Sequence, residues 1–460
     1  MSISQIDNVQ KNWQPYSEIH AIMVFVKVTS IEIIKKLKKA GFEAYWAGGC
    51  VRDMLLGTKP QDFDIVTSAQ PEEIEKILSH TIPIGKQFGV MLAVVNGHHF
   101  EIATFRSDSG YSDGRRPDAV FFTNAREDAK RRDFTINGMF YDPIEDKVLD
   151  YVGGQSDLDQ RLIRFIGNPH ERIMEDHLRI LRAIRFKNVL NFQYEPETYK
   201  ALLKHASLLI DKVSNERIRD ELNKMIASKY AVNAFKEMED LGILKIILPE
   251  LQDMKGIAQP YEYHKEGDVW NHAMDSLASL SEEASLTLRW ATLLHDVGKP
   301  KTFAVKERIR FDHHDRASYE IAYKMLSRLH FEKKIIDEVC WLVQHHMMLV
   351  PLLDMPEGRK MHWFLHPYFK DLLKLFESDA RGTTPQHLEI VDQVRSLYES
   401  SIKRMSKIPR PLLHGEEVME LLNLKPGKRV GEILDQVMEK QLEGKIKTRK
   451  QAIEFIKTFL

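Results

Sequence analysis

The sequence predicts an α+β protein, with a mixed or antiparallel sheet near the N-terminus followed by an elongated, all-helical remainder. Short alternating or apolar runs fall between residues 31 and 150, and runs of this length are typical of strands. From residue 157 to 400, nearly every segment instead spaces its apolar residues as a helix does. The expected strands are 43–47, 63–66, 89–95, 100–104 and 119–122.

The remaining elements follow from local signals. Residues 31–40 have helical apolar spacing, and Gly41 is a natural helix stop. Asn96-Gly97, between two expected strands, predicts a tight hairpin. Three points in the sequence predict domain boundaries: a Gly-Gly pair where the spacing of apolar residues changes, a stretch rich in loop formers, and a stretch interrupted by prolines. The predicted parts are an N-terminal extension at 1–30, a head at 31–155, a neck at 156–255, a third domain at 256–400 and a tail at 401–460.

Bulk composition narrows the class of protein. The 460 residues are 43% hydrophobic, enough for several folded domains. Acidic and basic residues nearly cancel, 67 against 66, so any phosphate-binding surface must be local. Cys50 and Cys340 cannot form a disulfide framework, and we find no signal peptide or membrane span. We therefore expect a cytoplasmic protein without membrane association.

Gly48-Gly49, after an expected strand and before a helix-like stretch, predicts a phosphate-binding turn. Glycine lets backbone N–H groups approach a phosphate, and the start of a helix favours an anion. Arg52 could add a guanidinium that binds two oxygens at once. Taken alone, such a turn is more often only a turn.

Asp62 and Asp64 lie two residues apart in an expected strand, which would place both carboxylates on one face. Two such groups repel each other unless a cation lies between them, and Mg²⁺ suits a site completed by triphosphate oxygens. Two Mg²⁺ ions could activate an attacking hydroxyl and stabilise the leaving pyrophosphate. Glu101 is a candidate third acid. For the isolated pair, a solvated loop is the better interpretation.

Two further segments carry charges suited to a nucleotide. Arg131, Arg132 and Asp133 could bind phosphate oxygens and a ribose hydroxyl, although an exposed charged turn is the alternative. Asp176 and Arg179 are three apart at the start of an amphipathic helix and would share a face. They could contact the edge of a base, but helix spacing alone favours a surface salt bridge.

The ordered set of these four motifs resembles the class II CCA-adding enzymes and bacterial poly(A) polymerases. The resemblance covers about residues 30–250. It implies a polymerase-β-like nucleotidyltransferase head, catalytic metals on Asp62 and Asp64, and a helical neck in which Asp176 and Arg179 select CTP or ATP. It implies that Arg132 and Asp133 help to select ribose, and that a flexible loop runs from Arg106 to Pro117. The implied nucleotide site is Gly48, Gly49, Arg52, Arg131, Arg132, Asp133, Asn137, Asp176, Arg179 and Arg182, with Asp62, Asp64 and Glu101 catalytic.

A second cluster is rich in histidine. His295-Asp296 ends an apolar helix and could place two ligands on one divalent transition metal. The stretch resembles HD-type metal-dependent phosphohydrolase domains. That resemblance implies the ligands His272, His295, Asp296 and Asp379, and a second ion on His314 and His346 in preference to the adjacent His313 and His345. Such a domain can hydrolyse phosphate esters or serve as a scaffold.

The tail at 401–460 is locally basic, with thirteen Lys and Arg against eight Asp and Glu. Pro426-Gly427 predicts a turn between two helices. We expect the tail to contact an RNA backbone, as the C-terminal segment of CCA-adding enzymes does, although a solvated surface is the alternative. The candidate RNA-binding residues are Lys428, Arg429, Lys445 and Lys447.

These observations predict a tRNA nucleotidyltransferase that adds CCA from CTP and ATP. Poly(A) synthesis and partial addition of only CC or A stay open as alternatives. A competitor from another class is an HD phosphohydrolase that uses the head only to bind RNA. A tRNA-binding module without enzymatic activity would not need the carboxylate pair. We expect tRNA, ATP and CTP as partners and predict no protein partner.

Overall fold

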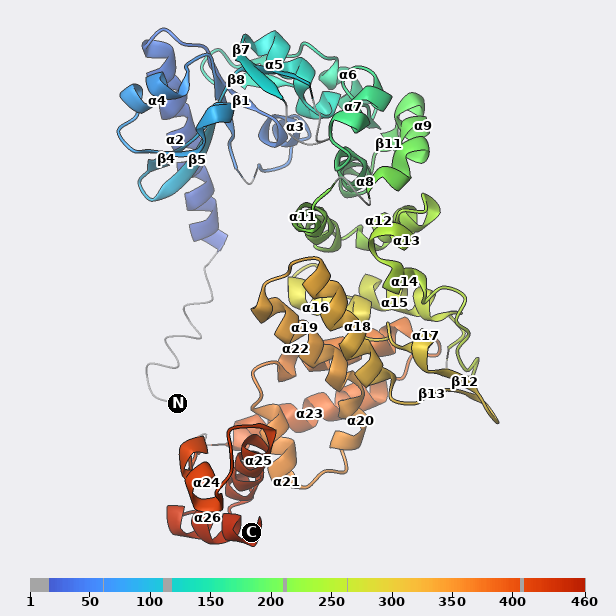
Figure 1. Ribbon diagram of the computed structural model, residues 1–460. Coiled ribbons are helices and arrows are strands. Elements are labelled where there is room, and N and C mark those ends of the chain that lie inside the picture. The colour runs from blue at the N-terminus through green and yellow to red at the C-terminus, as the bar shows by residue number, and fades with distance from the viewer. Residues whose placement is uncertain are drawn as a thin grey trace. The chain divides into compact units, whose positions relative to one another are not determined.

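The computed structural model describes residues 16–60, 62–110, 118–209, 213–262, 264–405 and 409–459, with the side chains of its first helix from Met23 onward. The chain divides into two compact units, one ending at Ile247 and the other beginning at Leu248. Figure 1 labels their helices and strands. The two units are described separately below.

The N-terminal unit begins with one long helix and a sheet, and continues as short helices. The elements of its head are α2 (Tyr16–Lys39), β1 (Ala44–Ala47), α3 (Gly49–Leu55), β2 (Ile65–Thr67), α4 (Pro71–Ile77), β3 (Thr81–Gly85), β4 (Val90–Val95), β5 (His98–Thr104), β6 (Arg106–Ser109), β7 (Ala119–Phe122), α5 (Ala125–Arg131), β8 (Phe140–Asp142) and β9 (Lys147–Leu149). The elements that follow are α6 (Gly154–Asp159), β10 (Leu162–Ile163), α7 (Pro169–Glu175), α8 (Arg179–Leu190), β11 (Gln193–Tyr194), α9 (Pro196–His205), α11 (Asn215–Ile226), α12 (Ala231–Asp240) and α13 (Leu244–Ile247).

The main sheet has seven strands in the order β3-β4-β5-β2-β1-β8-β9. Only β2 and β5 pair in parallel, and every other neighbouring pair is antiparallel. The predicted hairpin is confirmed: β4 and β5 pair up to Val95 and His98. Asn96 and Gly97 both have positive φ, 52° and 80°, as a tight primed turn requires.

Helix α2 packs against this sheet through a fully buried stripe of Ile33, Ile34 and Leu37. The helix begins well before the predicted start at residue 31 and ends at Lys39, before Gly41 with φ 93°. The indole nitrogen of Trp46, on β1, donates to the hydroxyl of Ser30 at 3.0 Å. The helix thereby helps to fix the strand that leads into the Gly48-Gly49 turn.

Strands β6 and β7 form a separate two-stranded sheet. They flank most of the loop that the family resemblance singles out, whose residues 111–117 lie outside the described part of the chain. The loop's first residue is held in place: the Arg106 guanidinium donates to the carbonyl of Phe88 at 2.6 Å.

The C-terminal unit is mainly helical. Its elements are α14 (Pro249–Gln252), α15 (Val269–Ala278), α16 (Leu286–Leu294), α17 (Lys299–Thr302), β12 (Phe303–Val305), β13 (Ile309–Phe311), α18 (His314–Arg328), α19 (Lys333–His345), α20 (Leu349–Leu352), α21 (Glu357–Phe364), α22 (Phe369–Gly382), α23 (Leu388–Arg404), α24 (Gly415–Leu422), α25 (Lys428–Leu442) and α26 (Arg449–Ile456). The Pro426-Gly427 turn does separate two helices, α24 and α25. These helices and α26 share one apolar core, which includes Val418, Ile433 and Ile456.

The predicted α+β fold class is confirmed, because a seven-stranded sheet is followed by helices. Two short pairs of strands, which were not predicted, interrupt the helical part. Strands β10 and β11 pair in parallel between the helices of the neck. Strands β12 and β13 form an antiparallel hairpin in the C-terminal unit. Each strand has only two or three residues, too few to show a period of two in the sequence.

Candidate functional site

A polar cavity of about 450 Å³ lies in the N-terminal unit. It collects side chains from widely separated parts of the sequence, which are Gly48, Gly49, Arg52, Asp62, Asp64, Arg131, Arg132, Asp133, Asn137, Asp176, Arg179, Arg182, Arg185 and Phe186. Every residue that the sequence assigns to nucleotide binding therefore lines one cavity. Of the predicted catalytic residues, Asp62 and Asp64 line it and Glu101 does not.

One wall of the cavity is the turn between β1 and α3. Gly48 has φ 73°, a region that favours glycine. A Cβ at this position would lie 3.5 Å from Nη1 of Arg132 and 3.9 Å from Oδ2 of Asp64, so the bare backbone approaches both groups. Arg52 is 9% exposed and donates to Oδ1 of Asp53 and, at 2.7 Å, to Oδ1 of Asn137. Its orientation is thus fixed before any ligand arrives.

The two carboxylates Asp62 and Asp64 precede strand β2 and are not part of it, so the strand begins later than predicted. Burial raises the pKa of Asp64 to about 6, and the charges of Asp62 and Glu101 act in the same direction against that of Arg132. Glu101 is exposed on β5, but it is close enough to influence this pKa. The three acids therefore repel one another, and a cation between them would relieve this repulsion.

Asp128, a residue that the sequence did not single out, holds both arginines of the Arg131-Arg132 pair. It is fully buried, and its Oδ1 accepts from Arg131 at 2.7 Å while its Oδ2 accepts from Arg132 at 3.1 Å. The same Oδ1 accepts from the backbone N–H of Arg106. Burial alone would raise the pKa of Asp128, but the two arginines lower it overall. The carboxylate therefore stays charged and fixes both guanidinium groups.

Asp133 has no acceptor position left for a ribose hydroxyl. Its Oδ2 accepts two N–H groups of Arg182, and its Oδ1 accepts from the backbone of Phe134 at 2.8 Å and from Asn137 at 3.2 Å. A carboxylate offers about four acceptor sites. Although burial opposes this, Arg182 holds the pKa of Asp133 well below its usual range. The residue positions Arg182 at the cavity wall.

Asp176 and Arg179 do not share a helix face, contrary to the prediction. Helix α7 ends at Glu175, Asp176 has an extended backbone with φ −150°, and α8 begins at Arg179. The two side chains do not pair with each other. Arg179 donates to the Glu175 carboxylate at 2.6 Å, and Asp176 accepts both terminal nitrogens of Arg217, at 3.0 and 2.7 Å. Both nevertheless line the cavity.

Phe186 forms an apolar floor that the sequence analysis missed. The guanidinium carbons of Arg52, Arg182 and Arg185 lie 5.1, 5.3 and 4.0 Å from the centre of its ring. Arg185 also donates to the buried carboxylate of Glu221 at 2.6 Å. The sequence did contain a sign of this contact: Arg182 and Phe186 lie four residues apart on α8, which makes them neighbours on the helix surface. Arg217 and Glu221 lie on α11, and the sequence gives no sign of their contacts.

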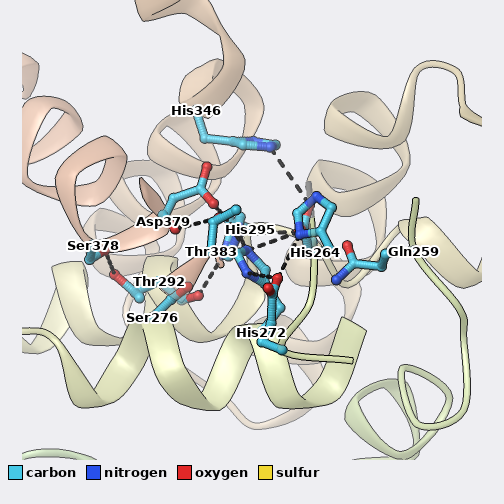
Figure 2. Close-up of polar contacts among 12 residues, drawn as sticks. Gln259, His264, His272, Ser276, Thr292, His295, His346, Ser378, Asp379 and Thr383 are labelled. Atoms are coloured by element: carbon cyan, nitrogen blue, oxygen red, sulfur yellow. Dashed lines mark hydrogen bonds and ion pairs between the residues drawn. The ribbon is translucent and has the colours of Figure 1, made fainter. Parts of the chain in front are cut away.

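The C-terminal unit holds a second cluster, which we call the His-Asp cluster: His272, His295, Asp296, His314, His346 and Asp379. Figure 2 shows most of these side chains turned toward one another. Nε2 of His272 lies 3.2 Å from Nε2 of His295 and 3.0 Å from Oδ1 of Asp379. All residues predicted as ligands therefore come together.

Asp296 links the two halves of the His-Asp cluster. Its Oδ2 lies 3.3 Å from Nε2 of His295, while its Oδ1 lies 3.3 Å from Nε2 of His314 and 3.8 Å from Nε2 of His346. The donor atoms form two close groups that could each hold a cation, His272, His295 and Asp379 in one and Asp296, His314 and His346 in the other. His313 and His345 belong to neither group.

The outward nitrogens of these histidines are held as metal ligands require. Nδ1 of His295, His314 and His346 each lies 2.7–2.9 Å from a backbone carbonyl oxygen, which leaves Nε2 of each ring free to bind a cation. His272 differs, because its Nδ1 lies 3.3 Å from Oε1 of Glu266. Against the effect of burial, the charges of Asp296 and Asp379 raise the pKa of His295 to about 10. The cluster thus attracts positive charge.

The four predicted RNA-binding residues lie on the surface of the tail. Lys428 and Arg429 open helix α25, and Lys445 and Lys447 precede α26. The side chain of Lys428 is 92% exposed, whereas Lys445 pairs with Glu443 at 2.6 Å. All four charges are accessible to a large anion. None of the described helices is long and apolar enough to span a membrane.

Family comparisons match the chain in four segments. Residues 44–164 match the Poly A polymerase head domain, and 191–255 match the model described as "Probable RNA and SrmB- binding site of polymerase A". Residues 267–362 match the HD domain, and 316–456 match domain 2 of tRNA nucleotidyltransferases.

Individual relatives align over most of their length. A CCA-adding enzyme of Bacillus velezensis is 33% identical over 93% of this chain and 96% of its own. An A-adding tRNA nucleotidyltransferase of Deinococcus radiodurans is also 33% identical, over 89% and 94%. Among solved structures, the Bacillus stearothermophilus CCA-adding enzyme in complex with CTP matches with a TM-score of 0.64, at 25% identity over 93% of this chain and 96% of that one.

Proposed function

The chain belongs to the family of CCA-adding tRNA nucleotidyltransferases, and we propose on this basis that it completes the 3′ ends of immature tRNA with C, C and A from CTP and ATP. The observation that carries the proposal is the single cavity of the N-terminal unit. It brings a carboxylate pair, a glycine turn and an array of arginines around one space. This is what a nucleoside triphosphate and its metal ions need.

The cavity has a phosphate end and a base end. Gly48, Gly49 and Arg52 offer backbone approach and a fixed guanidinium to the triphosphate. Asp62 and Asp64 would hold two Mg²⁺ ions, which supply activation of the tRNA 3′ hydroxyl and stabilisation of the leaving pyrophosphate. Carboxylates of this kind are the ligands that Mg²⁺ prefers. Burial and the charges of Asp62 and Glu101 raise the pKa of Asp64 to about 6, so a cation bound beside it would stabilise the carboxylate.

Base selection is assigned to Asp176 and Arg179. A carboxylate accepts from the N–H groups of a base, and a guanidinium donates to its ring nitrogen and carbonyl. Both side chains are already oriented by Arg217 and Glu175, so little freedom is lost on binding. Arg132 and Arg182, which line the same cavity, are assigned to the ribose and phosphates. Asp133 acts by positioning Arg182.

The tail is assigned to the tRNA backbone through Lys428, Arg429, Lys445 and Lys447, a contact that is independent of sequence and weakened by salt. We place the enzyme in the cytoplasm. The two cysteines, Cys50 and Cys340, are free and buried, which suits a reducing compartment.

The test uses three tRNA transcripts that end before CCA, after C and after CC, each with CTP and ATP. Completion of all three supports CCA addition. Completion of only the CC transcript would show an A-adding enzyme, an activity that one relative is named for. Extension stopping at CC would show a CC-adding enzyme, and long A tails on unrelated RNA would show a poly(A) polymerase.

The catalytic assignment has its own test. Asp62→Ala plus Asp64→Ala should abolish incorporation of both nucleotides. Asp118→Ala, a change of another acid in the same head, serves as the control and should leave the chemical step intact. Incorporation by the double variant at the wild-type rate would remove the two carboxylates from the mechanism.

A second function is favoured by the His-Asp cluster: metal-dependent hydrolysis of a phosphate ester. Its inward Nε2 atoms and carboxylates form two groups that could each hold a cation, and Asp296 lies between them. A divalent transition ion bound there would supply an activated water. Release of phosphate from 3′-phosphorylated or cyclic phosphates, measured in the Asp62→Ala plus Asp64→Ala variant, tests it. If phosphate release is the only activity of the wild-type protein, the head is an RNA-binding part of a hydrolase.

A further inference from the structure

Two histidines meet where helices α7 and α9 of the N-terminal unit pack against each other (Figure 1). His170 lies in the first turn of α7, and His205 is the last residue of α9. The side chain of Asn168 accepts from the backbone N–H of His170 at 3.0 Å, and Pro169 fixes the backbone at the first helical position. The backbone beneath His170 is therefore held in place. Both histidine side chains are partly exposed, so a small solute can reach them.

The rings of His170 and His205 are arranged like those of a pair in the His-Asp cluster. Nδ1 of His170 lies 3.0 Å from Nε2 of His205, and the ring centres are 5.2 Å apart with the planes at 71°. In the cluster, the nearest nitrogens of His272 and His295 are 3.2 Å apart, and the ring centres are 5.2 Å apart at 68°. The second pair therefore repeats the geometry of two residues that belong to the candidate cation sites.

The distance between the two nitrogens suits a shared metal ion. Two imidazole nitrogens bound to one ion at about 2.0–2.1 Å are about 2.9 Å apart when the bonds are at right angles, and about 3.3–3.4 Å apart in a tetrahedron. The observed 3.0 Å falls within this interval. A hydrogen bond between two neutral rings has the same length, so the experiment below must separate the two cases.

The protonation of His205 favours metal binding. Burial lowers the pKa of His205 from its usual value, and the positive charges of His170, Lys204 and His177 act in the same direction. Near neutral pH the ring of His205 is therefore uncharged, which is the form that binds a metal ion.

Helix α7 supports the nucleotide cavity from its far end. Arg172 donates to the backbone carbonyl of Arg132 at 2.7 Å, and Glu175 accepts from Arg179 at 2.6 Å. Arg132 and Arg179 both line the cavity. An ion that joins the first turn of α7 to the end of α9 would therefore stabilise the helix on which these two contacts depend.

We propose that His170 and His205 bind a divalent transition ion that clamps α7 to α9, with water completing the coordination. Imidazole ligands favour Zn²⁺ or Ni²⁺ over Mg²⁺, which prefers oxygen. Neither histidine lines the nucleotide cavity, and neither belongs to the His-Asp cluster. The site is thus separate from both functions assigned above.

The test is modification of histidines by diethyl pyrocarbonate on the full chain, followed by peptide mapping, as Zn²⁺ is raised. A bound ion blocks the nitrogens that the reagent attacks, and mapping separates this pair from the His-Asp cluster. His330, an exposed histidine after α18, is the reference for binding to a single ring. We expect His170 and His205 to be protected together, at a Zn²⁺ concentration at least about tenfold below that for His330, since two linked ligands hold one ion.

Variants show whether the two rings share the ion. His205→Ala should raise the Zn²⁺ concentration that protects His170 by at least about tenfold, and His170→Ala should do the same for His205. Residues that only orient a metal ligand contribute about 10–100-fold in affinity, so a ligand should contribute no less. Lys204→Ala is the matched control, because it removes an exposed neighbour that cannot join the pair. It should change protection by no more than about threefold, towards tighter binding.

Thermal unfolding measures the clamp itself, and circular dichroism without metal checks that each variant is folded. The rise in the midpoint of unfolding that Zn²⁺ produces should be smaller in either histidine variant than in wild type, and unchanged in Lys204→Ala. Ni²⁺ should also protect the pair, and Mg²⁺ should not. The proposal is overturned if only one of the two histidines is protected, if an alanine variant leaves its partner protected as in wild type, or if His330 or Mg²⁺ gives the same protection.

Discussion

Replacing Arg217 by alanine should relax nucleotide selection without removing catalysis. Both terminal nitrogens of Arg217 donate to the two oxygens of Asp176, and the side chains are 22% and 17% exposed. Without these two bonds, the one remaining donor to the Asp176 carboxylate among the described residues is the backbone N–H of Leu178, at 3.1 Å. Two partly screened charge-assisted bonds orient a side chain by about 2 kcal/mol, or about thirtyfold. The preference for CTP and ATP over UTP and GTP should fall by up to that factor.

The assay is single-nucleotide incorporation into tRNA transcripts that end before CCA and after CC, with each of the four nucleotides in turn. Arg219→Ala is the matched control, because Arg219 lies on the same helix α11 and pairs with exposed Asp220. Arg217→Lys should give an intermediate result, since an ammonium cannot bind both oxygens in the same plane. Unchanged selectivity in Arg217→Ala, or an equal loss in the control, would refute a positioning role.

Three further outcomes follow from the two sites. Arg179→Ala should also relax the choice of nucleotide in the four-nucleotide assay, and a strict C-C-A order would count against its role. His295→Ala plus Asp296→Ala should remove bound metal, measured by elemental analysis, and spare nucleotide addition; unchanged metal content would contradict the assignment. Burial and neighbouring carboxylates raise the pKa of Asp64 to about 6, so protons should compete with Mg²⁺ below that pH. The Mg²⁺ concentration for half-maximal incorporation should rise by up to about tenfold per unit below pH 6 and stay level above pH 7.

Local pattern predicted the strands that alternate or carry a strong turn signal, and missed those that do not. The hairpin at Asn96-Gly97 is visible in two residues. Strand β3 was missed because its middle residues, Ile82 to Ile84, are exposed and show no alternation. Strands β2 and β5 pair in parallel, although the antiparallel pair β3–β4 lies between β2 and β5 in the sequence. No local periodicity in the sequence indicates this pairing.

The candidate site was predictable where a motif is continuous in sequence. Gly48-Gly49, Asp62, Asp64 and the Arg131-Arg132-Asp133 segment all line one cavity. The prediction that Asp176 and Arg179 share a helix face was wrong, because residues 176–178 separate α7 from α8, and apolar spacing does not reveal so short an interruption. The partners that orient these groups come from distant elements. Only the fold brings them together.

The carboxylates around the nucleotide cavity separate into two kinds. Asp128, Asp133 and Asp176 each bind one or more arginines at hydrogen-bond distance. Within the described residues, Asp62 and Asp64 form no ion pair at all, although arginines line the same cavity. An acid beside several cations remains unpaired only if the fold directs those cations elsewhere. Here Asp128 holds Arg131 and Arg132, and Asp133 holds Arg182. The result is a cavity that offers both guanidinium groups and two unpaired carboxylates, which is the division of charge that the proposed nucleotidyl transfer with metal ions requires.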